Sequence, residues 1–223
     1  MCGRYTLEPE ANETLKRLFD KANLRLEESV GVFPMPMKKI ATGEIFPSDT
    51  ILTLLGDKAT ENVGAYATRW GIRSKSLVIN ARAETLLEKV TFRPLFSRQR
   101  CIIPTNGFFE WQHGNKKNEK STKYYFGLGR STPLYLAGLY RVHEGELESV
   151  IITTASNPSV SEVHDRMPLI IAQEDLRRWL FDDSFAQNNY SGRCPHSRRT
   201  LFDRENRICS IFEINKHILD LKK

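Results

Sequence analysis

The second residue of the chain, Cys2, can carry a chemistry that is closed to cysteines elsewhere in a protein. Aminopeptidases remove an initiator methionine when the next side chain is small, so loss of Met1 would leave Cys2 with a free α-amine beside its thiol. This 1,2-aminothiol captures an aldehyde as a Schiff base, and the thiol then closes a thiazolidine ring. Reference pKa values of about 7.7–8.0 for the amine and about 8.5 for the thiol leave a useful fraction reactive near neutral pH. The alternative is that Cys2 is a small buried hydrophobe in a first strand.

Asn80 and Arg82 form a second pair with chemical potential, because they flank one alanine at the end of an apolar run. At strand spacing their side chains project from the same face. An asparagine there can hydrogen-bond a substrate, and an arginine can hold a phosphate. A strand end with an asparagine turn and a solvated arginine is the alternative.

Glu110 and His164 are the remaining candidates for proton transfer. Glu110 lies in an apolar strand, where a carboxylate is either a paired structural charge or an acid–base group whose pKa burial has raised. His164 stands at the expected end of a short helix and can act as a general acid or base near neutral pH, or simply cap the helix. We do not expect a dyad between His164 and Asp165, because neighbours in sequence rarely present their side chains to each other.

Metal and cofactor sites are not indicated by the sequence. Cys194 and His196 offer too few ligands for a zinc site, and no paired Cys-x-x-Cys occurs. No glycine-rich phosphate loop is present either. Trp70 and Trp111 could stack on exposed bases, although tryptophans are more often part of a core. We therefore expect neither a metal nor a cofactor.

The composition is that of a globular protein with a basic surface. The chain has 223 residues, which fits one domain, and a formal net charge of +6, which is compatible with a polyanionic partner. No apolar run approaches the ~18–20 residues of a membrane span. No signal peptide is recognisable, so we expect a cytoplasmic protein, or a nuclear one in a eukaryote. The four scattered cysteines are then expected to be reduced thiols.

The elements that must position these side chains are many short strands with a few dispersed helices. This pattern predicts a single α+β domain built on a mainly antiparallel sheet, rather than a doubly wound fold. Helices are expected where Leu15, Leu18, Phe19 and Ala22 recur at helical spacing, at 84–90, after an Asn157 cap and at 174–181. Strands are expected at 2–6, 50–55, 63–70, 76–79, 101–104, 107–111, 124–128, 134–140, 150–154, 169–172 and 208–214, whereas 182–203 is expected to be irregular.

Four separated motifs in this order resemble the SOS response-associated peptidase (SRAP) family, whose members shield abasic sites in DNA. They are residues 1–5 (MCGRY), 79–85 (INARAET), 107–111 (GFFEW) and 164–168 (HDRMP). Lesser matches occur at 69–71 and 151–155. The resemblance runs from residue 2 to about residue 180, and the tail 182–223 matches poorly. It implies one SRAP-like domain over 1–223 with a partly barrel-like β core.

The resemblance also implies how the chemistry is divided. Cys2 would be the nucleophile that crosslinks to an abasic site, and Asn80 would hydrogen-bond the adduct. Glu110 would steer protonation of the amine or sugar. His164 would assist opening of the sugar ring and reversal of the crosslink. The family name records a proposed autopeptidase activity that would remove residues ahead of Cys2.

The partner implied by the resemblance is single-stranded DNA that contains an abasic site, especially near a junction with duplex. Arg4, Arg82 and Arg166 would hold phosphates, and Trp70 and Thr153, from the lesser matches, would belong to the DNA interface. The chain departs from the family pattern in two places. It lacks the asparagine of a DNA-contacting Asn-x-Ala-Pro-Thr stretch near 45–48, and the proline of a Trp-Gly-x-x-Pro stretch after Trp70.

Two other functions remain open from the sequence. One is a cysteine-dependent peptidase that acts on proteins, with Cys2 and His164 as its dyad. The other is a non-catalytic protein that binds single-stranded DNA.

Overall fold

Five strands of the larger sheet close on themselves into a ring. They are β3 (Thr50–Asp57), β4 (Asn62–Trp70), β6 (Arg100–Thr105), β9 (Leu134–His143) and β10 (Glu146–Ala155). Each strand pairs with the next in the order β10, β4, β3, β6, β9, and β9 pairs again with β10. Only the pairing of β10 with β4 is parallel within this ring. The computed structural model describes residues 2–28, 39–112, 120–129, 131–190 and 211–213.

The second half of β10 leaves the ring and carries two further short strands. The strand β5 (Asn80–Arg82) runs parallel to it, and Asn80 is aligned with Ile151. The strand β11 (Arg166–Pro168) runs antiparallel on the other side. As a result β10 brings two of the motifs, which are far apart in the chain, to neighbouring positions. The predicted α+β class with a mainly antiparallel, partly barrel-like core is confirmed.

A second sheet of five antiparallel strands packs against the ring. Its order is β12 (Ile211–Glu213), β8 (Thr122–Phe126), β7 (Gly107–Gln112), β1 (Tyr5–Leu7) and β2 (Gly43–Ile45). The strands β6 and β7 are separated by a single residue yet belong to different sheets. This crossing places the first strand of the chain beside β7, so that the amino terminus lies at the boundary between the two sheets.

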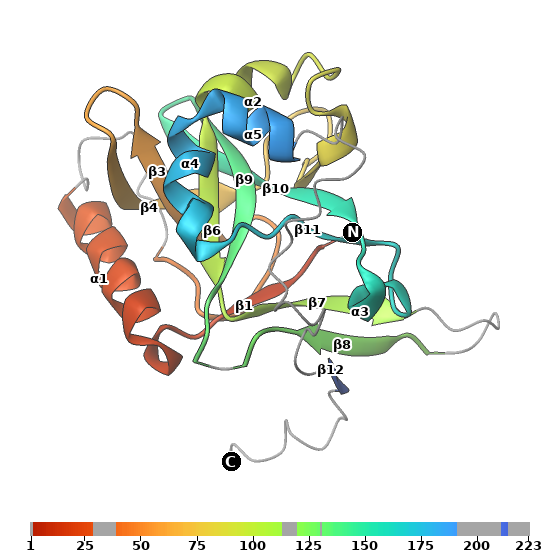
Figure 1. Ribbon diagram of the computed structural model, residues 1–223. Helices are drawn as coiled ribbons and strands as arrows, with labels where there is room; N and C mark the ends of the chain where they lie inside the picture. The colour runs from red at the N-terminus through yellow and green to blue at the C-terminus, as the bar shows by residue number, and fades with distance from the viewer. Residues whose placement is uncertain (1, 29–38, 113–119, 130, 191–210, 214–223) are drawn as a thin grey trace.

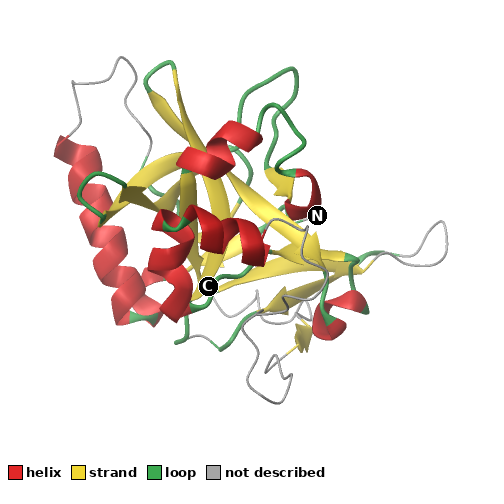
Figure 2. Cartoon of the chain, turned by 45° about the horizontal axis from the view of Figure 1, so that its top comes forward, coloured by secondary structure: helices red, strands yellow, loops and turns green. Residues whose placement is uncertain are grey.

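The helices α1 (Glu13–Glu28), α2 (Arg93–Arg98) and α4 (Leu176–Phe181) cover the outside of the ring (Figure 1). The longest, α1, lies along β4, and the start of the chain lies on the opposite side of the molecule (Figure 1; Figure 2). The cap predicted at Asn157 is confirmed, because its side-chain oxygen accepts a 3.0 Å hydrogen bond from the Val160 N–H. The other helices are α3 (Pro158–Ser161) and α5 (Asp183–Tyr190), with short 3-10 turns at Pro9–Ala11, Ala83–Thr85 and Gln173–Asp175.

Several local predictions were wrong. The expected helix at 84–90 is only the 3-10 turn Ala83–Thr85 followed by irregular turns. The first part of the supposedly irregular 182–203 segment is α5, which packs against Trp179; residues 191–203 lie outside the described part. Residues 169–172, expected to be a strand, make only one isolated antiparallel bridge, between Ile170 and Leu136 of β9. The strand that pairs with β10 lies earlier, as β11. Among the described residues, no helix is both long enough and apolar enough to cross a lipid bilayer.

Candidate functional site

Cys2 lies just before β1 and is fully buried. Its Sγ is 3.8 Å from the carbonyl oxygen of Arg4, the acceptor of a weak thiol hydrogen bond. Burial raises the pKa of the Cys2 thiol far above its usual value, and the negative charge of Glu110 raises it further. The raised pKa therefore favours the protonated thiol over the thiolate.

Asn80 is the residue that holds the backbone of Cys2 in place. Its Nδ2 donates a 2.9 Å hydrogen bond to the Cys2 carbonyl oxygen across the boundary between the two sheets. Its Oδ1 is buried and has no hydrogen-bond partner among the described residues. A buried amide oxygen without a partner costs free energy, so this atom is an acceptor that is available to a group entering the site.

Glu110 lies on β7 and is only 2% exposed. The register between β1 and β7 pairs Tyr5 with Phe108, so its continuation sets Glu110 level with the segment that precedes Tyr5. Burial raises the pKa of Glu110 to about 7, and the negative charge of Asp165 acts in the same direction. A carboxyl group with this pKa can both accept and release a proton near neutral pH.

His164 stands in the turn between α3 and β11. Its Nδ1 accepts a 2.9 Å hydrogen bond from the Arg166 backbone N–H, and the same atom lies 3.0 Å from Asp165 Oδ1. Our expectation that His164 and Asp165 would not face each other is therefore wrong. The tight turn brings both side chains to one side, while the Asp165 backbone carbonyl accepts from the Ser156 N–H.

The three arginines expected at phosphates lie in different environments. Arg82 is exposed on β5 and makes no ion pair with any described residue. The Arg4 guanidinium is stacked 3.6 Å from the centre of the Phe46 ring and lies 3.4 Å from a Glu44 carboxylate oxygen. Arg166 is engaged with Glu84. Arg82 is thus the freest of the three for an incoming phosphate.

The pair of Arg166 and Glu84 joins β11 to the turn that follows β5. The two guanidinium Nη atoms donate to the two Glu84 carboxylate oxygens at 2.8 and 2.9 Å, and Arg166 Nη2 also donates to the Thr153 backbone carbonyl at 2.8 Å. Thr153 itself is completely buried. Thr153 therefore supports Arg166 through its backbone carbonyl oxygen, and its side chain is not presented at the surface.

Trp70 does not offer a face for stacking on a base. The side chain is fully buried, its ring centre is 5.2 Å from that of Tyr5, and its Nε1–H donates to the Ile79 carbonyl oxygen at 3.1 Å. The sequence-based expectation that Trp70 contacts DNA directly is corrected by this burial. Its ring instead supports the β1 and β5 ends that carry Cys2 and Asn80.

Two side chains of this site were missed in the sequence. Glu84 lies inside the 79–85 motif, but an acidic side chain beside a proposed phosphate site gave no reason to select it. Phe46 is 44% exposed and packs on Arg4, and an exposed aromatic cannot be told from a core residue by sequence alone. Among the described residues, no group of three or more His, Cys, Asp and Glu side chains could hold a metal ion.

A surface groove of about 1080 Å³ lies apart from these residues. It is lined by side chains of α1, β3, β4 and α2, including Arg25, Tyr66 and Arg98, and contains none of the predicted site residues. The candidate chemistry is at the buried sheet boundary around Cys2, and not in this groove.

Comparison with known proteins agrees with the family resemblance of the motifs. The family model described as SOS response associated peptidase (SRAP) matches residues 1–200. The abasic site processing protein YoqW of Bacillus subtilis is 32% identical over 193 residues, with 81% of this chain and 80% of the relative covered. The abasic site processing protein YedK of Escherichia coli is 26% identical over 189 residues, with 81% and 79% covered. HMCES of Xenopus tropicalis, also named an abasic site processing protein, is 30% identical over an alignment of 123 residues, with 45% of this chain and 37% of that protein covered.

Solved structures share the fold. A protein from Bordetella bronchiseptica superposes with a TM-score of 0.63 at 20% identity, covering 92% of this chain and 96% of that chain. A protein from Bacteroides thetaiotaomicron gives a TM-score of 0.57 at 22% identity, covering 80% and 81%.

Proposed function

The chain belongs to the SOS response associated peptidase (SRAP) family, and from this membership and the geometry around Cys2 we propose that it captures abasic sites in single-stranded DNA as a covalent crosslink. The relatives named abasic site processing proteins support an abasic site as the substrate. The observation that carries the proposal is the hydrogen bond from Asn80 to the Cys2 carbonyl, with the buried Glu110 carboxyl group alongside.

The proposed reaction begins when removal of Met1, by an aminopeptidase or by autoproteolysis, frees the α-amine of Cys2. The amine adds to the C1′ aldehyde of the ring-opened sugar and loses one water molecule to give a Schiff base. The thiol sulfur then adds to the same carbon, and its proton passes to the nitrogen, which closes the thiazolidine. Because its pKa is raised, the thiol is protonated when the reaction begins. It adds only after the Schiff base has formed, when the C1′ carbon is more electrophilic and the nitrogen can take the thiol proton.

The neighbouring groups divide the proton transfers. Glu110, with a pKa of about 7, takes a proton from the Cys2 ammonium group so that the free amine can add to the aldehyde, and later gives a proton to the hydroxyl group that leaves as water. His164 donates to the sugar ring oxygen when the ring opens. The Asn80 amide fixes the backbone of the nucleophile, and this orientation supplies effective concentration, worth up to ~7–11 kcal/mol in well-oriented cases.

The DNA partner is held by charge and not by base identity. The net charge of +6 and the exposed Arg82 support contacts to phosphates, which bind any sequence. A missing base leaves room for Cys2 to reach the sugar, so the lesion is selected by its aldehyde. The preferred DNA is a single strand, including one that ends at a junction with duplex.

A denaturing gel tests the proposal. The protein is mixed with a single-stranded oligonucleotide that carries one abasic site, and with the same oligonucleotide carrying a normal base or a reduced abasic sugar. We expect a band that survives heat and denaturant only with the aldehyde-bearing strand. A cysteine peptidase acting on proteins would give no such band, and neither would a non-catalytic DNA binder. The absence of the band would therefore overturn the proposal.

A further inference from the structure

We propose that Gln112 is a positioning residue, whose side-chain amide ties the turn that carries His164 to the strand that carries Glu110. This tether keeps the two groups assigned to proton transfer at a fixed separation. Its effect on the reaction rests on the proposed function, whereas the tether itself is a property of the protein without DNA. Gln112 directly follows the 107–111 motif and was not selected from the sequence.

The turn that carries His164 is a compact unit built around the short helix α3. The Val160 backbone N–H donates to Asn157 Oδ1 at 3.0 Å, and the Val160 carbonyl oxygen accepts from the His164 N–H at 2.9 Å. The Ser156 N–H donates to the Asp165 carbonyl oxygen at 2.9 Å, which closes the turn. The position of His164 therefore follows that of α3. A helix of 4 residues is not stable by itself, so its orientation depends on what it contacts.

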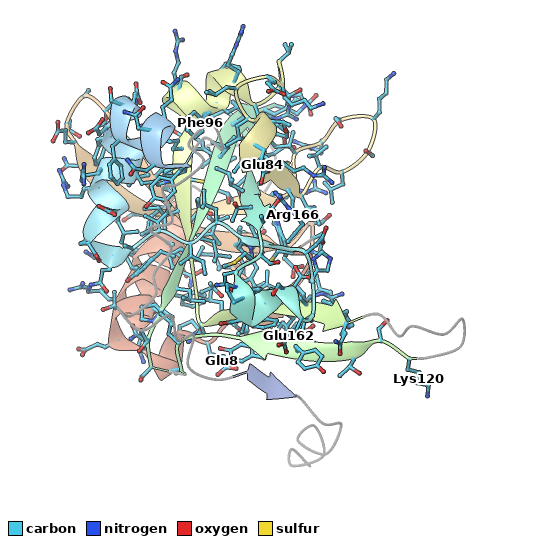
Figure 3. The ribbon with its side chains drawn as sticks, turned by 45° about the vertical axis from the view of Figure 1, so that its right-hand side comes forward. Glu8, Glu84, Phe96, Lys120, Glu162 and Arg166 are labelled. Carbon is cyan, nitrogen blue, oxygen red and sulfur yellow. The ribbon has the colours of Figure 1, made fainter. Side chains whose placement is uncertain are left out.

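Gln112 connects this turn to the second sheet. It is the last residue of β7, and its Nε2 donates a 2.8 Å hydrogen bond to the Glu162 carbonyl oxygen. Glu162 follows the last residue of α3, where carbonyl groups have no partner within the helix. Figure 3 shows Glu162 beside the paired strands β7 and β8. Glu110 lies two residues before Gln112 on β7, so their side chains project from the same face of that strand.

Tyr124 fixes which end of the Gln112 amide faces α3. Its hydroxyl group donates a 3.1 Å hydrogen bond to Gln112 Oε1. An amide has an oxygen that accepts and a nitrogen that donates, so this bond directs the nitrogen to the Glu162 carbonyl oxygen. The register pairs Tyr124 with Glu110 across β8 and β7, which places the phenol diagonally from Gln112. The second sheet therefore holds the amide in the orientation that binds the turn.

The tether matters for the reaction because separate parts of the fold place Glu110 and His164. Glu110 is buried in the second sheet, whereas His164 lies between α3 and β11 of the larger sheet. A group that transfers a proton must lie within hydrogen-bond reach of the atom that it serves. A displacement of about 1 Å can lower a rate by ~10²-fold, so a bond between the two parts acts on the rate. Because this bond is exposed, its loss should free the turn without unfolding the domain.

The direct test is hydrogen exchange of the backbone amides in the DNA-free protein. Gln112→Ala should speed exchange of the His164 and Val160 N–H groups by roughly two- to tenfold, the effect of losing one hydrogen bond on local opening. Gln112→Met keeps the length of the side chain without its hydrogen bonds and should give the same result, and Tyr124→Phe should give a smaller one. The matched control Gln173→Ala, an exposed glutamine before α4, should leave these rates unchanged. Unchanged exchange at His164 in both Gln112→Ala and Gln112→Met would overturn the proposal.

A second measurement separates positioning from a direct contact with DNA. Crosslinking is followed in a single turnover with saturating abasic-site DNA, and the affinity for intact single strands is measured beside it. Gln112→Ala should lower the crosslinking rate constant by roughly three- to tenfold, a part of the ~10²–10⁴-fold typical of acid–base catalysis, and should leave the affinity unchanged. In a His164→Gln background the same change should have no further effect, because Gln112 acts through His164.

Two outcomes of this measurement would contradict the tether. A weaker affinity with an unchanged rate at saturation would identify Gln112 as a DNA contact. A further loss of rate in the His164→Gln background would show that Gln112 acts elsewhere in the domain. If the wild type makes no crosslink while exchange at His164 still follows Gln112, the proposed function fails and the tether stands.

Discussion

The side-chain amide of Asn80 donates a hydrogen bond of 2.9 Å to the carbonyl oxygen of Cys2, which is 78 positions away in the chain. This contact links the two sheets at the point where the chain begins. It fixes the backbone of Cys2 without occupying either of the groups that would react, the α-amine and the thiol.

Replacement of Cys2 by alanine should abolish the heat-stable adduct and leave non-covalent binding of intact single strands unchanged. The reason is that only Cys2 combines an amine and a thiol on one residue, whereas phosphate contacts do not involve it. The measurement pairs a denaturing gel with a binding titration, and Cys101→Ala serves as the matched control because Cys101 is also a fully buried free thiol. A normal yield of stable adduct from Cys2→Ala would rule out the thiazolidine.

A blocked amino terminus should also prevent the adduct. An amide nitrogen is not basic enough to form a Schiff base, so protein with an acetylated α-amine or an uncleavable residue before Cys2 should fold normally and fail to crosslink. Intact mass and the gel are recorded on the same sample, and active protein should lack Met1. Full crosslinking by protein proven to be blocked would contradict the mechanism.

Arg82→Ala should weaken binding to intact single strands of every sequence. Loss of one phosphate contact lowers the log–log salt slope by about 0.7 for single strands. Arg93→Ala, which removes an exposed arginine from α2, is the control and should leave the slope unchanged. Equal slopes for Arg82→Ala and wild type would mean that Arg82 does not contact the backbone.

Glu110 should make the stability of the protein depend on pH. Its pKa is raised from about 4.3 in an unfolded chain to about 7 by burial. The folded state therefore binds the proton more tightly, so the stabilisation is complete below pH ~4.3 and is lost as the pH rises through 7. Glu110→Gln should flatten this fall in the free energy of unfolding, measured by urea denaturation between pH 4 and 8.

For this last prediction the control is Glu174→Gln, an exposed glutamate at the start of the last helical region. It should keep the wild-type pH dependence. A pH profile of Glu110→Gln identical to that of the wild type would show that Glu110 does not carry the shifted proton.

The local features of this protein were determined by its sequence. The strands at 50–55 and 63–70, the stripe of α1 and the cap at Asn157 were all predicted, because alternation, helical spacing and capping depend on near neighbours. The chemistry available to Cys2 also follows from its place in the chain alone. The proximity of Cys2 and Asn80 was implied only by the family resemblance, and the hydrogen bond between them could not be derived from the sequence.

Only the tertiary structure decided how these pieces meet. Closure of the ring between β9, β10 and β4 sets β5 and β11 on either side of one strand, and that placement lets Glu84 reach Arg166. It also buries Trp70, which the sequence offered to DNA. A contact between residues far apart in the chain depends on long-range strand pairing. Strand pairing therefore decided that the Arg166 guanidinium meets the Glu84 carboxylate, a contact that the sequence did not indicate.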